Sequence, residues 1–413
     1  MFAHKRKLFA SGLAACAVFV CLTACGKEQG TEQPAEGTES GAVSSHLNAS
    51  GKKIGLSFPA AAEGSTYAER AAFLESLFKA EGCEVITLFA NEAEVEAAAA
   101  ESASSSLPAA EDGEEPAGQE AKEGQQTKDV ASLIGSSCDI LVIFPDGKSS
   151  LGSVLQRAKE ANIPVISYDG LIEGSDAVTC YVAVDSYRMG RLQGEYLAAS
   201  LGLGTAEHSK LHTIEFVAGL PSDYRSGYIF NGAYDVLQPY FDAGTLSVPS
   251  GEISYSKVSA YGEEPEAVKE RLTGIFRDFY GKSMQPDAVL CPSDSAAGGA
   301  IAAVESVFGG KSKVSVTGAG ASKDALSLIG DGKQAMTLYW NPEWEADVTR
   351  DVVLTILDGD PADASLIRDG GWEFGCTYDT ASYDNGTGII PSFLISPQTI
   401  TKANMSEVQQ KKQ

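Results

Sequence analysis

The chain has 413 residues and a formal net charge of −25, which arises from 56 acidic and 31 basic side chains. Its length allows two domains. Such an acidic surface argues against nucleic acid or anionic lipid as a partner and suits a solvated, exported protein. The eight cysteines include no CxxC pair, so neither a disulfide scaffold nor a zinc site is indicated.

The first residues have the pattern of a bacterial export signal. Basic residues 4–7 precede an apolar run over residues 8–20, and the sequence LTAC ending at Cys25 matches a lipobox. Residues 1–24 would be removed, and a lipid on Cys25 would anchor the protein to a membrane surface without spanning it. An uncleaved transmembrane anchor is the alternative, although the apolar run is short for a bilayer span. Residues 25–51 are rich in Gly, Ser, Thr and Glu and predict a flexible tether.

Beyond the tether, short apolar runs alternate with stretches of helical periodicity. The expected strands cover residues 53–59, 84–89, 140–144, 165–168, 177–185, 212–218, 253–260, 288–292, 313–318, 334–339 and 389–395. The expected helices cover residues 67–81, 127–135, 151–158, 187–201, 221–241, 265–279, 296–308, 325–330 and 342–357. This alternation predicts α/β architecture with parallel, doubly wound sheets. There are about twice as many βα units as one such sheet holds, so we expect two Rossmann-like lobes with a cleft between them.

Residues 91–126 interrupt this alternation. They are rich in Ala, Glu, Ser, Gly and Pro and contain too little apolar surface to fold alone. We expect a disordered or partly helical acidic insertion within the first lobe.

The pattern of residues 139–172 predicts a complete βαβ unit. Each of its two strands ends on a carboxylate, Asp146 and Asp169. Ligands of open parallel sheets bind beyond the carboxyl ends of the strands, so these acids predict a polar ligand site. Asp146 has an alternative role as the cap of the helix that follows it.

Five segments, in this order along the chain, carry a family resemblance. They are VISYD at residues 165–169, YVAVD at 181–185, EFVAG at 215–219, PDAVL at 286–290 and IPSFL at 390–394. Together they resemble the bacterial periplasmic sugar-binding proteins of the xylose-binding and multiple-sugar-binding type. The resemblance covers about residues 52–408, apart from the acidic insertion.

The resemblance implies the type I periplasmic binding protein fold, in which two lobes close on a ligand about three chain crossings. We expect these crossings near Asp185, near Trp340 and Asn341, and near Gly388. The expected boundaries are residues 52–185 and 341–388 for lobe I, and residues 186–340 and 389–413 for lobe II.

The resemblance also implies a sugar site in the cleft. Carboxylates and guanidinium groups bind sugar hydroxyls in pairs, and aromatic rings pack on the C–H faces of sugars. The expected ligand contacts are Asp146, Asp169, Arg225, Asp294, Trp340, Tyr67 and Tyr224.

Three of these residues have alternative roles. Asp294 stands before a helix that it could cap, Arg225 could pair with Asp223 at the surface, and Trp340 could belong to the core.

The family pattern is also incomplete. Gly170 stands where the family has an arginine, Ala319 and Gly320 replace a glutamine and an acid, and Trp340 replaces a lysine or glutamine. These replacements predict a different or less hydroxylated ligand, or weaker sugar binding.

The favoured function is that of a lipid-anchored, extracytoplasmic solute-binding protein, which captures a monosaccharide and delivers it to the permease of an ABC importer. The alternatives are a sensor that presents its closed form to a chemoreceptor or a histidine kinase, and a binder of a nucleoside or an aromatic ligand. We expect a monomer with no nucleic-acid partner, no cofactor and no metal site. Because the sequence has no GxSxG, Walker or HExxH motif, we do not expect an enzyme.

Overall fold

The computed structural model describes residues 49–91, 124–205, 210–281 and 284–411. The expected signal segment, Cys25, most of the expected tether and most of the acidic insertion lie outside these ranges. The described residues belong to one unit of the chain, residues 44–413. None of the described helices is both long enough and apolar enough to span a bilayer.

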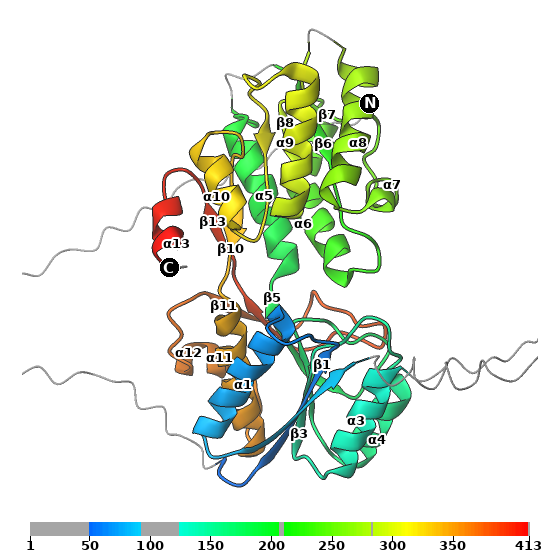
Figure 1. Cartoon of the computed structure of the whole chain (residues 1–413), viewed down its shortest axis with the longest axis vertical. Helices are drawn as coiled ribbons and strands as arrows, with labels where there is room; N and C mark the ends of the chain where they lie inside the picture. Colours follow the sequence, from blue (N-terminus) through cyan, green and yellow to red (C-terminus); the bar gives the residue numbers. More distant parts are fainter. Residues whose placement is uncertain (1–48, 92–123, 206–209, 282–283, 412–413) are drawn as a thin grey trace, which may run out of the picture. The chain divides into compact units, whose positions relative to one another are not determined.

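The first lobe is built on a seven-stranded sheet with the strand order β11-β12-β5-β4-β3-β1-β2 (Figure 1). Neighbouring strands are parallel except for the pair β11 and β12, which is antiparallel. The strands are β1 (Lys53–Pro59), β2 (Glu84–Ala90), β3 (Ile140–Ile143), β4 (Val165–Tyr168), β5 (Val178–Val184), β11 (Cys376–Asp379) and β12 (Ser392–Ile395).

Helices cover both faces of this sheet. Figure 1 shows α1 (Thr66–Ala80) beside α11 (Pro342–Leu357), and α3 (Gln125–Gly135) beside α4 (Gly152–Glu160). Along β3, Ile140 and Val142 join the apolar cluster under α1 and α11, whereas the alternate residues join the cluster under α3 and α4. Because both faces of the strand are buried, its sequence is an unbroken apolar run rather than an alternating one.

The second lobe contains a parallel four-stranded sheet with the order β7-β6-β8-β9. Its strands are β6 (His212–Phe216), β7 (Leu246–Ser247), β8 (Ala288–Leu290) and β9 (Ser315–Val316). One apolar cluster joins this sheet to α5 (Ser186–Ser200) and α6 (Tyr224–Asp242), and another joins it to α8 (Pro265–Ile275) and α9 (Asp294–Phe308). The expectation of two doubly wound α/β lobes is confirmed.

The remaining described elements are short. They are α7 (Tyr255–Val258), a 3-10 helix (Ser259–Tyr261), a π-helix (Phe276–Tyr280), α10 (Lys323–Gly330), β10 (Thr337–Tyr339), α12 (Ser365–Asp369), β13 (Gln398–Ile400) and α13 (Met405–Lys411). The prediction of a strand over residues 253–260 is wrong, because α7 and the 3-10 helix occupy this segment. The strand that pairs with β6 is β7. After β7, the backbone N–H and the hydroxyl of Ser250 donate hydrogen bonds to the buried Glu215 carboxylate.

The chain crosses between the lobes at the ends of its strands. Asp185 links β5 to α5, and Trp340 and Asn341 link β10 to α11. The third crossing expected near Gly388 is wrong, because β12 still pairs with β5 in the sheet of the first lobe. The crossing follows β12, at residues 396–397, before β13 pairs with β10. Residues 389–395 therefore belong to the first lobe and not to the second.

Close approach of α5 and α6 depends on glycine. A Cβ atom on Gly190 would lie 1.9 Å from the carbonyl oxygen of Ile229, and one on Gly232 would lie 2.1 Å from the carbonyl oxygen of Tyr187. Real Cβ atoms do not approach backbone oxygens this closely, so the two helices can pack at this separation only if both positions lack a side chain.

We expect Gly232→Ala to lower the free energy of unfolding by about 1–3 kcal/mol, because the two helices must separate to accept the methyl group. The matched control is Gly298→Ala in α9, where an added Cβ atom would meet no neighbouring segment within 4 Å. That change should raise stability by about 0.5–1 kcal/mol through helix propensity. Urea denaturation of both variants measures the difference. A Gly232→Ala protein as stable as the parent would contradict the packing argument.

Candidate functional site

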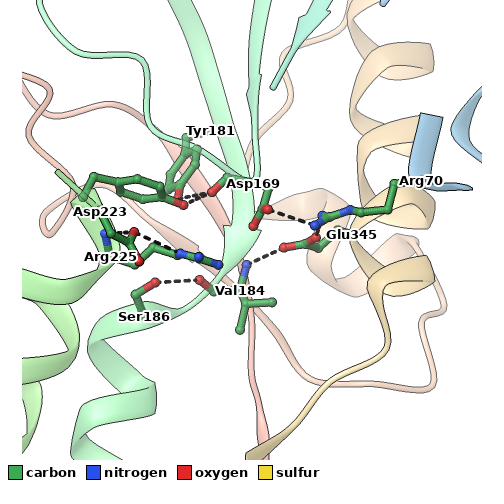
Figure 2. Close-up of polar contacts among 9 residues, drawn as sticks. Arg70, Asp169, Tyr181, Val184, Ser186, Asp223, Arg225 and Glu345 are labelled. Carbon is green, nitrogen blue, oxygen red and sulfur yellow. Dashed lines mark hydrogen bonds and ion pairs between the residues drawn. The ribbon is translucent and has the colours of Figure 1, made fainter. Parts of the chain in front are cut away.

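Arg70, on α1, extends toward the carboxylates of Asp169 and Glu345 (Figure 2). Its Nη1 donates to Oδ2 of Asp169 at 2.9 Å, and its Nη2 donates to Oε2 of Glu345. The guanidinium carbon also stands 5.2 Å from the ring centroid of Phe144 and 5.1 Å from that of Tyr168. The Arg70 side chain is only 13% exposed, so these carboxylates and rings replace most of its water.

Asp169 directly follows β4 and has a left-handed backbone conformation, with φ of 56°. Aspartate tolerates this region better than most residues because its short polar side chain bonds locally. The carbonyl oxygen of Asp169 accepts hydrogen bonds from the hydroxyls of Tyr181, at 2.8 Å, and Tyr224. This turn directs the carboxylate toward Arg70 (Figure 2).

Glu345 lies in α11 and is completely buried. Its Oε1 accepts the backbone N–H of Val184 at 2.9 Å, while Oε2 contacts Arg70. Burial and the nearby Asp169 carboxylate raise the pKa of Glu345, and Arg70 opposes them. Burial alone would lower the pKa of Arg70, but Glu345 and Asp169 raise it above its ordinary value. The guanidinium therefore stays charged.

Arg225 enters this region from the first turn of α6. Its Nε donates to Oδ1 of Asp223 at 3.3 Å, and Asp223 also caps the helix by accepting the backbone N–H of Arg225. Burial would lower the pKa of Arg225, but the nearby Asp169 carboxylate raises it above its ordinary value. Arg225 is therefore a second permanent cation near Asp169.

Two pockets meet at Arg225. The first is bounded by side chains of both lobes and is lined by Ser65, Thr66, Tyr67, Arg70, Phe144, Asp169 and Arg225. The second is lined by Met189, Gly219, Asp223, Arg225, Ser226, Ile229, Glu263, Pro292, Ser293, Ala319 and Trp340. Carboxylates, guanidinium groups and aromatic rings thus face the same space. Such a lining can bind a polar ligand that has both hydrogen-bonding groups and an apolar face.

Comparisons with known proteins agree on one family. A model of the periplasmic binding protein domain matches residues 87–361. The multiple sugar-binding periplasmic protein SbpA of Azospirillum brasilense is 32% identical over 282 residues, which cover 68% of this chain and 74% of that protein. The chain belongs to the periplasmic binding protein family. Proteins of this family bind solutes and are not enzymes.

Two further relatives of this periplasmic binding protein are informative. The multiple sugar-binding periplasmic receptor ChvE of Rhizobium radiobacter is 30% identical over 286 residues, covering 68% of this chain and 76% of the receptor. An ABC transporter solute-binding protein from Clostridium phytofermentans, solved with bound β-D-glucose, is 30% identical with a TM-score of 0.65. That structural match covers 86% of this chain and 96% of the other.

Several residues predicted from the sequence come together in this binding protein. Tyr67, Asp169 and Arg225 line the first pocket, and Trp340 lines the second. Tyr224 contributes its hydroxyl to the Asp169 carbonyl. Their roles as ligand contacts stay predictions.

Asp146 and Asp294 have structural partners instead. Asp146 accepts the backbone N–H groups of Lys148 and Ser149 and the Ser149 hydroxyl, all within the turn that follows β3. Its alternative role as the cap of the following helix is wrong, because α4 begins at Gly152 and its N-cap residue is Leu151. The Asp294 carboxylate accepts hydrogen bonds from the backbone of Ser322 and the side chains of Gln334 and Thr337. These bonds join three segments of the second lobe. The carboxylates are thereby engaged by the protein itself, which weakens the prediction that either contacts a ligand.

Arg70 and Glu345 were not among the contacts predicted from the sequence. The predicted contact in this part of the chain was Tyr67, about one helical turn before Arg70. A signal was nevertheless present, because Arg70 shares a helical stripe with the buried Leu74 and Phe78. A charged residue in a buried stripe must have a partner, since an unpaired buried charge is very costly.

We expect Arg70→Met to lower the free energy of unfolding by about 3–5 kcal/mol near pH 9, because Asp169 and Glu345 then lose the cation that they share. In the parent, burial already raises the pKa of Glu345 to about 8, and loss of Arg70 raises it further. Below the parent's value Glu345 is protonated in both proteins, so its share of the loss is absent there and grows as the pH rises above about 8. Urea denaturation should therefore show a smaller loss near pH 6 than near pH 9.

The matched control for this prediction is Arg350→Met. Arg350 also contacts carboxylates, those of Asp347 and Asp351, but its side chain is 26% exposed. We expect that variant to lose less than about 1 kcal/mol, with little pH dependence. Equal losses in the two variants would show that Arg70 does not neutralise a buried charge.

Proposed function

We propose that this chain is an extracytoplasmic solute-binding protein that captures a monosaccharide in the pocket between its lobes and delivers it to the permease of an ABC importer. The main support for this function is the set of residues that line the first pocket. Arg70 and Asp169 come from the first lobe and Arg225 comes from the second, so one ligand can contact both lobes. A ligand that bridges two lobes favours their closed arrangement.

The chemistry of the lining suits a sugar. The Oδ1 atom of Asp169 makes no hydrogen bond to any residue that the structure describes, so it is available as an acceptor for a hydroxyl. The Tyr67 ring packs edge-on against Phe144 at 5.1 Å between centroids and is 36% exposed at the pocket. An exposed ring of this kind can cover the C–H face of a pyranose.

The relatives support the same ligand class. SbpA and ChvE are named multiple sugar-binding proteins, and the protein from Clostridium phytofermentans holds β-D-glucose. The last protein is a component of an ABC transporter, which supports delivery to an importer.

A thermal-shift screen against pentoses, hexoses, polyols and nucleosides tests the ligand class. We expect at least one neutral monosaccharide to raise the midpoint, because a ligand that binds only the folded state stabilises it. Asp169→Asn keeps a residue that tolerates the left-handed conformation but removes the charge. It should weaken the binding of that sugar about 10- to 100-fold, as measured by calorimetry.

The control for the Asp169 variant is Asp331→Ala, which removes an exposed acid of the second lobe and should leave affinity unchanged. A midpoint raised only by nucleosides or aromatic compounds would reject the sugar assignment. Unchanged sugar affinity in Asp169→Asn would remove Asp169 from the site.

We also propose that a lipid on Cys25 holds the protein at a membrane. The proposal rests on the LTAC sequence, and a 46 kDa surface antigen of Mesomycoplasma hyopneumoniae, 28% identical over 311 residues, is consistent with display at a cell surface. We expect Cys25→Ser to abolish metabolic labelling with palmitate and to move the protein from the membrane fraction to the soluble fraction. Ser11→Ala, upstream of the lipobox, is the control. Continued labelling of the Cys25 variant would refute the anchor.

A further inference from the structure

The cations of the pocket are already neutralised by the protein. Each terminal nitrogen of Arg70 contacts a carboxylate, Asp169 on one side and Glu345 on the other. Arg225 is paired with a third acid, Asp223. Two guanidinium groups therefore face three carboxylates, and the site offers a ligand no excess of positive charge.

Glu345 takes part in this balance without reaching the pocket. Its side chain is completely buried and does not line either of the two pockets described above. Its second oxygen is held by the backbone N–H of Val184, so the carboxylate cannot rotate away from Arg70 without losing a buried hydrogen bond. Any effect of Glu345 on a ligand must pass through Arg70.

We infer that Glu345 is a positioning residue that sets the charge preference of the site, so that the pocket selects neutral polyhydroxyl ligands and rejects the corresponding sugar carboxylates. This inference rests on the proposed function and specifies its ligand class. A neutral hexose and its hexuronate share the ring and most hydroxyls. They differ in the group at C6, which makes them a sensitive pair of probes.

The site should reject anionic ligands because of the way the Arg70 guanidinium is oriented and neutralised. A free arginine binds a carboxylate through two parallel N–H bonds. Here both terminal nitrogens of Arg70 are engaged by carboxylates. An anionic ligand would also meet the Asp169 carboxylate in the pocket lining, while Glu345 offsets the charge of Arg70 from behind. Like charges in a partly desolvated site repel each other strongly, whereas a hydroxyl makes its hydrogen bonds without that cost.

The test is the affinity ratio of D-glucuronate to D-glucose, measured by calorimetry on the parent protein and on Glu345→Gln at about pH 9. This pH lies above the pKa of about 8 to which burial raises Glu345, so its carboxylate is mostly ionised there. The parent should prefer D-glucose. Glu345→Gln removes one negative charge behind Arg70, and the ratio should rise at least about tenfold. Asp331→Asn, an exposed change in the second lobe, should leave the ratio within about twofold of the parent.

A second variant separates charge from position. Glu345→Asp keeps the charge but shortens the side chain by one methylene, so it should weaken D-glucose binding while the ratio stays near that of the parent. A purely structural role for Glu345 would lower both affinities of Glu345→Gln by the same factor. An unchanged ratio in that variant would overturn the inference.

The outcomes also separate this inference from the proposed function. If the parent binds D-glucuronate more tightly than D-glucose, the charge inference fails while sugar binding stands. If the parent binds no sugar at all, the proposed function fails and this inference fails with it. If Glu345→Gln does not fold, as judged by thermal melting, Asp169→Asn removes a charge from the other side of Arg70 and should raise the ratio likewise. No rise in that variant would reject the inference.

Discussion

Burial of the Arg70 guanidinium is the constraint on which the candidate site depends. A buried cation is tolerated only if its lost water is replaced by opposite charge and hydrogen bonds. Asp169 and Glu345 supply the charge, and Phe144 and Tyr168 offer their ring faces to the same group. Arg70 lies on α1, and its partners come from α11 and the strand ends of the large sheet, so the ion cluster holds together elements distant in sequence. The same ion cluster therefore stabilises the packing of the first lobe and positions the side chains of the candidate site.

The cluster also lies close to the crossings between the lobes. Glu345 binds the backbone of Val184, the residue before Asp185 at the first crossing. Asp185 in turn accepts the hydroxyl of Tyr383, which also accepts the backbone N–H of Ser186. Arg70, Asp169 and Glu345 all belong to the first lobe, so a hinge rotation leaves their mutual contacts intact. The site is therefore preorganised on one lobe, and motion of the other changes mainly the approach of Arg225.

The local sequence pattern predicts those structural features that depend on residues close together in the chain. The βαβ unit around Asp169 follows from apolar runs and breakers, and the burial of β3 on both faces follows from its composition. Long-range pairing was not readable in this way. Residues 389–395 look like any buried strand, and nothing local in them says that β12 pairs with β5. Arg70 and Glu345 are separated by 275 residues, so only the fold could show that each neutralises the other. The sequence does show a charged residue, Arg70, in the buried stripe of a helix. This predicts that Arg70 has a partner of opposite charge but does not identify the partner.

Contacts between the two lobes affect how much binding energy a ligand must supply to hold the lobes together. Tyr224 of the second lobe donates its hydroxyl to the Asp169 carbonyl of the first, and the Tyr228 ring stacks on Tyr383 with centroids 4.7 Å apart. A ligand shifts an equilibrium between two arrangements only by its differential affinity for them. Because these tyrosines already favour the arrangement in which Arg225 lies near Asp169, the ligand has to contribute only the remaining difference. The proposed capture of a sugar is therefore compatible with the loss of family polar contacts at Gly170 and Ala319, because these interlobe contacts of the chain itself would contribute to closure.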